Sequence, residues 1–132
     1  MVVLITGSTG FIGKRLVNKL QSSGHQLRVI SRNPVPGIET FIADLKGPDI
    51  PSEALSGVDT IFHLAGYAHD LREAAKMRDI YYSINVDSTF RLAELAIQNK
   101  VKRFIFVSSV KAGGPPIAGH CISEEEQGEP KG

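Results

Sequence analysis

The chain has 132 residues, of which 42% are hydrophobic and 22% are charged, and its formal net charge at pH 7 is +1. This length predicts one domain with a hydrophobic core, and the composition excludes an intrinsically disordered chain. The 15 basic residues are scattered along the sequence, so we expect neither a nucleic-acid-binding surface nor a nucleic-acid partner. No segment has the length of a transmembrane helix or the pattern of a signal peptide, and we therefore expect a cytoplasmic protein that does not bind a membrane.

A glycine-rich turn follows the first apolar segment, residues 2–5, in the pattern Thr6-Gly7-x-x-Gly10-x-x-Gly13. Because Gly7 and Gly10 lack a Cβ, the backbone can approach a bulky anion there, while Gly13 allows the next helix to pack closely against the strand. The N-terminus of that helix directs its free N–H groups and its positive dipole end at the anion. The pattern predicts a site for the pyrophosphate of a dinucleotide, and a tight turn without a ligand is the competing interpretation.

Strands and helices alternate through the first half of the chain. We expect a helix after the glycine turn that ends at Gly24, and an apolar stripe at helical spacing consists of Ile12, Leu16, Val17 and Leu20. Short apolar runs predict strands over 27–30 and 40–43, separated by a proline-containing loop. A short helical turn is expected over 52–56.

The second half of the chain continues the alternation. A strand is predicted over 59–64, and residues 70–79 favour a partly exposed helix or an ordered loop. A long helix is predicted over 83–99, with an apolar face formed by Val86, Phe90, Ala93 and Ile97. A fifth strand is expected over 104–107. Beyond Lys111, glycines, prolines and an acidic run predict loop, and the single cysteine, Cys121, excludes an internal disulfide and has no spacing suited to a metal site.

This order predicts an α/β fold, namely a Rossmann-like doubly wound parallel sheet of about five strands in the order 3-2-1-4-5 with helices on both faces. We expect a dinucleotide-binding domain over residues 1–112. Residues 113–132 are expected to form a flexible loop or tail that leads to a C-terminal half absent from this chain. The carboxyl ends of all strands meet at one edge of such a sheet, where ligands bind.

Polar residues follow several of the predicted strands. After the second strand, Arg32 stands where an acidic residue would bind the ribose 2′-hydroxyl of NAD, so Arg32 favours the 2′-phosphate of NADP, with a solvated surface arginine as the competing interpretation. After the third strand, Asp44 can accept a hydrogen bond from an adenine amino group, with helix capping or a loop salt bridge as the competing interpretation. The strand histidine His63 is interpreted as structural. Ser108 and Ser109 can either bind a substrate oxygen or simply cap the fifth strand.

Five motifs occur in register: the glycine pattern above, Asp44-Leu45, His63-Leu64-Ala65-Gly66, Asn85-Val86-x-x-Thr89 and Phe104-Ile105-Phe106-Val107-Ser108-Ser109. Together they resemble the NAD-dependent epimerase/dehydratase family of extended short-chain dehydrogenases/reductases, which includes sugar-nucleotide 4-epimerases. The resemblance covers about residues 1–112. It implies that Ser109 is the catalytic serine and that Asn85 ties the long helix to the neighbouring strand. The cofactor residues that it implies are Gly7, Gly10, Phe11 and Ile12 for the pyrophosphate, Asp44 and Leu45 for the adenine, and Leu64, Ala65 and Gly66 for the ribose on the nicotinamide side.

The family's general acid/base pair, a tyrosine followed four residues later by a lysine, is missing from the sequence. Its only tyrosines are Tyr67, Tyr81 and Tyr82, and none has a lysine four positions later. We therefore expect the cofactor-binding portion of a nucleoside-diphosphate-sugar epimerase, dehydratase or reductase that binds NAD or NADP and is inactive as this fragment. A non-catalytic dinucleotide-binding sensor or interaction module is the alternative. The bare edge of the fifth strand also predicts self-association or a homo-oligomer.

Overall fold

The computed structural model describes residues 1–67, 74–109, 119, 123 and 125. Its core is a five-stranded sheet in the order β3-β2-β1-β4-β5, and all neighbouring strands run parallel. The strands are β1 (Val2–Thr6), β2 (Gln26–Ser31), β3 (Glu39–Ile42), β4 (Thr60–His63) and β5 (Arg103–Phe106). The predicted Rossmann-like fold and strand order are confirmed, with strand ends displaced by at most one residue. Most of the expected tail, residues 113–132, lies outside the described residues.

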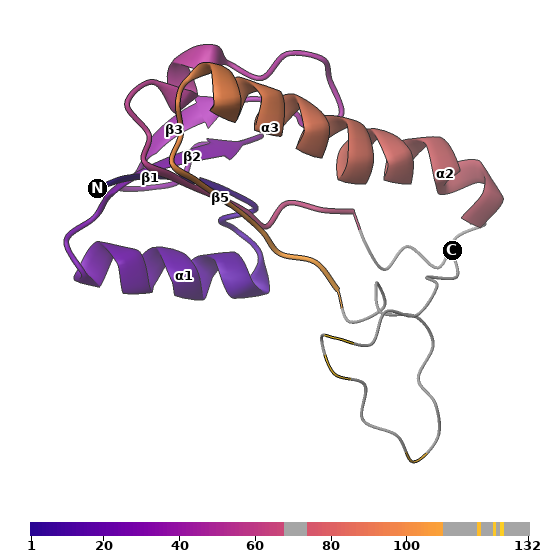
Figure 1. Ribbon diagram of the computed structural model, residues 1–132, viewed down its shortest axis with the longest axis horizontal. Helices are drawn as coiled ribbons and strands as arrows, with labels where there is room; N and C mark the ends of the chain where they lie inside the picture. The colour runs from indigo at the N-terminus through magenta and orange to yellow at the C-terminus, as the bar shows by residue number, and fades with distance from the viewer. Residues whose placement is uncertain (68–73, 110–118, 120–122, 124, 126–132) are drawn as a thin grey trace.

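Helices cover both faces of the sheet (Figure 1). On one face lies α1 (Phe11–Ser22), and on the other lies α3 (Ser88–Gln98), while α2 (Ala74–Tyr82) extends beyond the ends of the strands. The predicted helix over 83–99 is interrupted, because its first turn is a π-helical segment, η2 (Ser83–Asp87), that joins α2 to α3. A 3₁₀ turn, η1 (Ser52–Leu55), stands where the short helical turn was predicted. Within the described residues, no helix is both long and apolar enough to cross a membrane.

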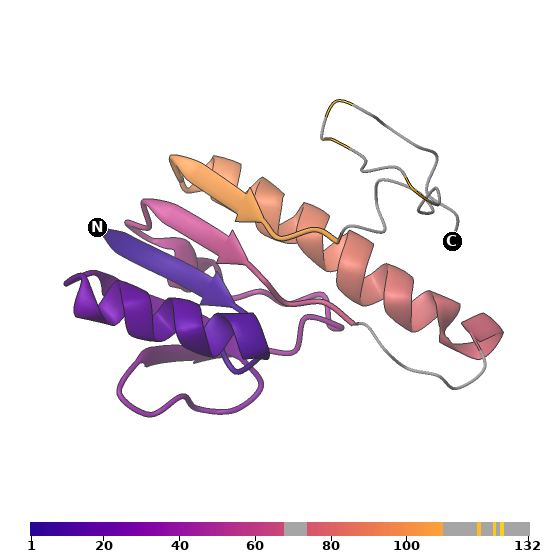
Figure 2. The ribbon, with the colours of Figure 1, turned by 90° about the horizontal axis from the view of Figure 1, so that it is seen from below.

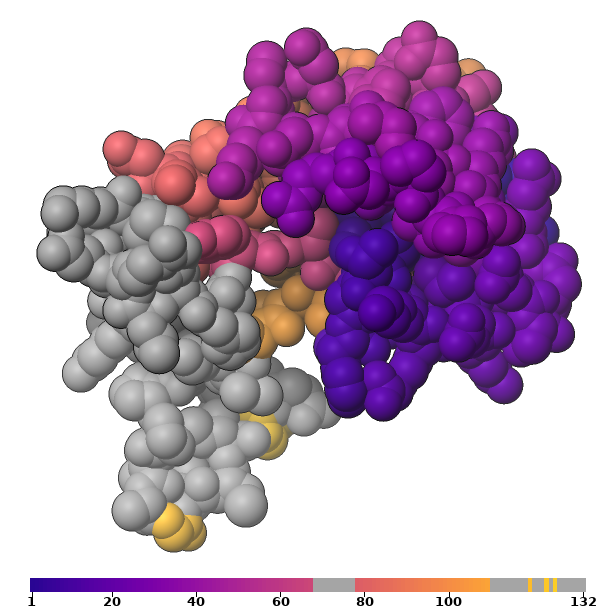
Figure 3. All heavy atoms as spheres, turned by 180° about the vertical axis from the view of Figure 1, so that it is seen from behind, coloured from indigo at the N-terminus to yellow at the C-terminus, as the bar shows by residue number. Residues whose placement is uncertain are grey.

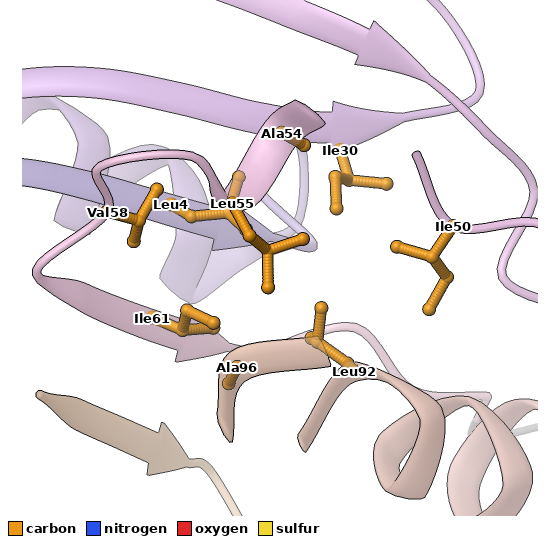
Figure 4. Packing of buried hydrophobic residues seen from close by; sticks show 9 residues of the cluster. All are labelled: Leu4, Ile30, Ile50, Ala54, Leu55, Val58, Ile61, Leu92 and Ala96. Atoms are coloured by element: carbon orange, nitrogen blue, oxygen red, sulfur yellow. The ribbon is translucent and has the colours of Figure 1, made fainter. Parts of the chain in front are cut away.

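The sheet separates two hydrophobic cores. The larger core lies between the sheet, η1 and α3 (Figure 4), and consists of Leu4, Ile30, Ile50, Ala54, Leu55, Val58, Ile61, Leu92 and Ala96. The smaller core lies on the α1 side and consists of Val3, Ile5, Val17, Leu27 and Val29. Successive residues of β1 thus alternate between the two cores, as the period of a strand requires. Burial on both faces explains why β1 is a continuous apolar run.

Two predicted helix faces are wrong in part. On α3, Phe90 and Ile97 are 67% and 78% exposed, whereas Leu92 and Ala96 are buried. The apolar residues of this helix form more than one stripe, and packing on the sheet selects the stripe that Leu92 belongs to. On α1, Ile12 is 55% exposed because the buried Gly13, one position later, occupies the point of closest approach to the turn after β1.

The amino-terminal edge of the sheet is held by Asp59, which precedes β4. Its carboxylate accepts a hydrogen bond from the backbone N–H of Val2 at 3.0 Å and pairs with Lys102 at 2.7 Å. The Lys102 hydrogen bond, followed by that from Val2, lowers the pKa of Asp59. These contacts join the starts of β1, β4 and β5. The three strands run in the same direction and end at the opposite edge (Figure 2).

Candidate cofactor-binding site

A cavity of about 330 Å³ lies at the carboxyl edge of the sheet. In the space-filling view, the surface of the N-terminal segment faces the segment that follows β4 across a hollow (Figure 3). The lining residues come from the turn after β1, the ends of β2, β3 and β4, and η2. They are Gly7, Ser8, Thr9, Gly10, Ile30, Ser31, Arg32, Ala43, Asp44, Leu45, Lys46, Leu64, Ala65, Gly66, Tyr67 and Ile84.

Most of the predicted cofactor residues meet in this cavity. Those that line it are Gly7, Gly10, Arg32, Asp44, Leu45, Leu64, Ala65 and Gly66. Phe11, Ile12 and Gly13 begin α1 beside the cavity and are not among its lining residues. The side chains of Phe11 and Ile12 are 76% and 55% exposed.

The glycine turn is packed against the end of β4. Gly7 has a φ of +73°, and a Cβ on it would lie 2.6 Å from the backbone nitrogen of Ala65. A Cβ on Gly13 would lie 2.1 Å from the carbonyl oxygen of Gly7. At both glycines, backbone atoms of another part of the chain thus lie so close that a side chain would collide with them. The missing Cβ of Gly7 serves this internal contact, which the sequence motif alone does not indicate.

The start of α1 carries features of an anion site. Gly10 is the N-cap residue, so the first helical N–H groups have no capping side chain to which they can donate, and the first turn holds no acidic residue. Ser8 is only 4% exposed, and its Oγ has no hydrogen-bond partner within the described part of the chain. Buried hydroxyl groups are rarely left unpaired. An anion with several acceptor oxygens, such as a pyrophosphate, would satisfy both the serine and the helix N-terminus.

Two cations stand on the rim of the cavity. Arg32 and Lys46 are exposed and line it. The side chain of Arg32 makes no ion pair or hydrogen bond with any residue that the structure describes. Asp44, also on the rim, uses Oδ1 to accept the backbone N–H of Lys46 at 3.0 Å, which shapes the loop after β3. The rim therefore presents more positive than negative charge beside the ends of β2 and β3.

The imidazole of His63 lies fully buried behind the cavity. Its Nδ1 is 2.6 Å from Oγ1 of Thr6 and its Nε2 is 2.9 Å from Oγ1 of Thr89. The rings of Phe104 and Phe106 pack against it, with centroids 6.0 Å and 5.8 Å away. Burial lowers the pKa of His63 from its usual 6.5 to about 4. His63 is therefore neutral at pH 7, in agreement with its interpretation as structural.

Asn85, in η2, holds the segment after β4, as predicted for this asparagine. Its side-chain amide accepts a hydrogen bond from the N–H of Tyr67 at 2.7 Å and donates one to the carbonyl oxygen of Tyr67 at 2.9 Å. The ring of Tyr67 meets that of Tyr81 edge to face at 5.1 Å. Sequence reasoning missed Tyr67, Lys46 and Ser8 as cavity residues, although the position of Ser8 inside the glycine motif was a usable signal.

Ser108 and Ser109, the candidate substrate-binding serines, follow β5 and are exposed. Neither is among the residues that line the cavity. A second cavity, of about 440 Å³, lies between the 48–51 loop and α3 and contains none of the predicted site residues. Among the residues that the structure describes, no cluster of His, Cys, Asp or Glu is arranged to hold a metal ion.

Comparisons with known proteins agree with this geometry. Over 128 residues the chain is 36% identical to 3 beta-hydroxysteroid dehydrogenase/Delta 5-->4-isomerase of Mycobacterium tuberculosis, covering 89% of this chain and 34% of that protein. Over 130 residues it is 35% identical to UDP-glucose 4-epimerase of Vibrio cholerae, covering 94% of this chain and 39% of that protein. The solved structure of MoeE5 in complex with UDP-glucose and NAD matches with a TM-score of 0.83 and 32% identity, covering 99% of this chain and 42% of that one.

The chain spans between about a third and two fifths of the length of these proteins. The family model described as "NAD dependent epimerase/dehydratase family" matches residues 3–131, which is nearly all of the chain. This match confirms the resemblance seen in the sequence motifs. The chain belongs to the NAD-dependent epimerase/dehydratase family.

Proposed function

We propose that this chain forms the dinucleotide-binding part of an NAD(P)-dependent enzyme that acts on a nucleotide sugar. The observation that carries the proposal is the buried hydroxyl of Ser8, which has no partner among the described residues and lies beside the uncapped N-terminus of α1. Both features leave hydrogen-bond donors available beside the place where a pyrophosphate is expected. The cavity that they border extends along the ends of β1, β2, β3 and β4, as the site for an elongated dinucleotide must.

The proposal gives each part of the cavity a role. The turn over residues 7–10 and the backbone N–H groups of Phe11 and Ile12 hold the pyrophosphate. Asp44 and Leu45 flank the adenine, and residues 64–66 flank the ribose on the nicotinamide side. The bound nicotinamide supplies the capacity to take up a hydride from a sugar carbon and to return it. Ser109 is proposed to orient the reacting hydroxyl or carbonyl group.

The substrate class is supported by the relatives. One is named UDP-glucose 4-epimerase, and the MoeE5 structure holds UDP-glucose together with NAD. Because the sequence contains no tyrosine followed four residues later by a lysine, we propose that these 132 residues alone do not turn over a nucleotide sugar. Epimerisation, dehydration and reduction all begin with hydride exchange at a sugar carbon, so the proposal covers the three reactions together.

The rim charges favour NADP over NAD. Arg32 has no competing partner in the described chain, and Lys46 stands on the same rim. We expect Arg32→Ala to weaken NADPH binding about tenfold, which corresponds to roughly 1.4 kcal/mol, and to change NADH binding less than twofold. Arg103→Ala is the matched control, because Arg103 is exposed at the opposite edge of the sheet. If Arg32→Ala lost the same factor in affinity for NADPH and for NADH, this would contradict the choice of NADP as cofactor.

Gly10 offers a test that separates binding from folding. Its backbone has a φ of −72° and a ψ of 174°, which suits a capping side chain, and a Cβ there would lie 3.3 Å from the Gly7 carbonyl oxygen. Gly10→Asp and Gly10→Asn have nearly the same shape and both are good N-caps. Only the aspartate brings a negative charge against the proposed pyrophosphate.

Calorimetric titration with ADP-ribose provides the measurement. We expect Gly10→Asp to bind at least about tenfold more weakly than Gly10→Asn, while both variants unfold at similar temperatures. Equal affinities of the two variants, or a wild-type chain that binds neither ADP-ribose nor a nicotinamide dinucleotide, would refute the proposed site.

A further inference from the structure

A continuous chain of hydrogen bonds runs through His63 from the glycine turn to η2. The N–H of Ala65 donates to Oγ1 of Thr6 at 3.2 Å, and that same oxygen lies 2.6 Å from Nδ1 of His63. On the other side of the ring, Nε2 lies 2.9 Å from Oγ1 of Thr89. The hydroxyl of Thr89 donates in turn to the carbonyl oxygen of Asn85 at 2.9 Å. All four contacts fall within the described residues.

These contacts assign the proton on the imidazole. A threonine hydroxyl has one hydrogen to donate, and that of Thr89 is committed to the carbonyl of Asn85. Thr89 can therefore only accept from His63, so Nε2 carries the proton and Nδ1 accepts from the hydroxyl of Thr6. The hydroxyl of Thr6 still accepts the N–H of Ala65. One neutral tautomer therefore satisfies every group in this hydrogen-bond network, whereas an imidazolium would take from the Thr6 hydroxyl the acceptor nitrogen to which it donates.

The same chain of bonds fixes one wall of the cavity, residues 64–67. Ala65 is held by Thr6 through its N–H. Tyr67 is held at both its N–H and its carbonyl oxygen by the side chain of Asn85, whose backbone carbonyl receives the Thr89 hydroxyl. His63 thus lies between the two anchoring points of the wall. Among the other lining residues, 7–10, 32 and 44–46 form none of these four hydrogen bonds.

We propose that His63 is a positioning residue of the cofactor site, whose neutral, Nε2-protonated ring links Thr6 to Thr89 and so holds the 64–67 wall in place. This inference rests on the proposed function, in which the 64–67 wall flanks the ribose on the nicotinamide side. His63 does not line the cavity and acts through its two threonine neighbours. Loosening the network therefore affects binding of the nicotinamide-side ribose and leaves binding of the adenosine side largely unchanged.

The matched variants are Thr89→Val and Thr89→Ser. Valine keeps the shape of threonine and removes the hydroxyl, which leaves the Nε2–H of His63 without its acceptor, whereas serine keeps the hydroxyl. The probes are ADP, which occupies only the adenosine and pyrophosphate part, and ADP-ribose, which adds the second ribose. We expect Thr89→Val to weaken ADP-ribose about five- to tenfold and ADP less than twofold, and Thr89→Ser to restore ADP-ribose to within twofold of wild type.

Nitrogen-detected NMR of the His63 ring gives a second readout that general destabilisation does not produce. We expect a neutral ring protonated at Nε2 in the wild type and in Thr89→Ser, and a changed Nε2–H signal in Thr89→Val. An Nδ1-protonated ring in the wild type, or losses of ADP and ADP-ribose binding in equal proportion in Thr89→Val, would overturn the inference while leaving the proposed function intact. A wild-type chain that binds neither probe would overturn both.

Discussion

Gly7 and Gly24 have nearly the same left-handed backbone, with φ of +73° and +75°, in different surroundings. A Cβ on Gly7 would collide with the backbone of Leu64 and Ala65, whereas one on Gly24 would meet nothing within 4 Å. Gly24→Ala therefore isolates the cost of the left-handed conformation, about 1 kcal/mol. We expect Gly7→Ala to lower the free energy of unfolding by at least about 2 kcal/mol more than Gly24→Ala does, as measured by urea denaturation. If the two variants lost equal amounts of unfolding free energy, this would contradict the close packing of the glycine turn on the end of β4.

His63 makes stability depend on pH. Its pKa is about 4 in the folded chain because the ring is buried, against about 6.5 when unfolded. Between these values the unfolded state binds more protons, so stability falls as the pH drops from 6.5 towards 4 and is fully present above 6.5. The loss attributable to this ring is of the order of 3 kcal/mol.

NMR titration of the His63 ring in the folded chain, together with urea denaturation across the same pH range, measures this effect. The groups that pack against the ring among the described residues are the hydroxyls of Thr6 and Thr89 and the rings of Phe104 and Phe106, none of which ionises in this range. If the His63 ring of the folded chain titrated near pH 6.5, this would contradict the claim that burial lowers its pKa.

At the scale of elements, α3 shows that sequence periodicity can identify a helix without identifying which of its faces is buried. The pattern identifies a helix correctly because its apolar residues recur at helical spacing. It does not identify which stripe faces the sheet, since Phe90 and Ile97 are as apolar as Leu92 and yet lie exposed. The π-helical turn η2 was not predicted either, and the hydrogen bond from the Tyr67 N–H to its Asn85 side chain joins residues 18 positions apart, which local propensity does not indicate.

The edge strand β5 leads to a prediction about association. β5 is the last strand of the sheet among the described residues, and Ile105 and Phe106 on it are 37% and 51% exposed. An apolar strand edge pairs readily with a second chain, so we expect concentration-dependent self-association in sedimentation. Ile105→Lys should reduce it, because a charged edge opposes pairing. A wild-type chain that remains monomeric at high concentration would contradict this expectation.

For the molecule as a whole, the sequence predicts the fold and the location of the cofactor site better than it predicts the individual contacts within that site. Strand order and the glycine motif suffice to bring Gly7, Arg32, Asp44 and Ala65 to one cavity, because parallel strands end at the same edge. The His63 network could not be predicted in this way, since it depends on contacts between residues that are far apart in the sequence. Nor could the burial of the Ser8 hydroxyl, which finds no partner within the described part of the chain.

The central claim is that the glycine turn and the start of α1 bind the pyrophosphate of a nicotinamide dinucleotide. A crystal structure of the chain soaked with NADPH and, separately, with NADH tests it most directly. We predict a pyrophosphate between residues 7–10 and the N-terminus of α1, with the buried Oγ of Ser8 within hydrogen-bond distance of one of its oxygens. A coenzyme bound elsewhere, or a glycine turn that remains empty at saturating concentrations of both coenzymes, would contradict the claim.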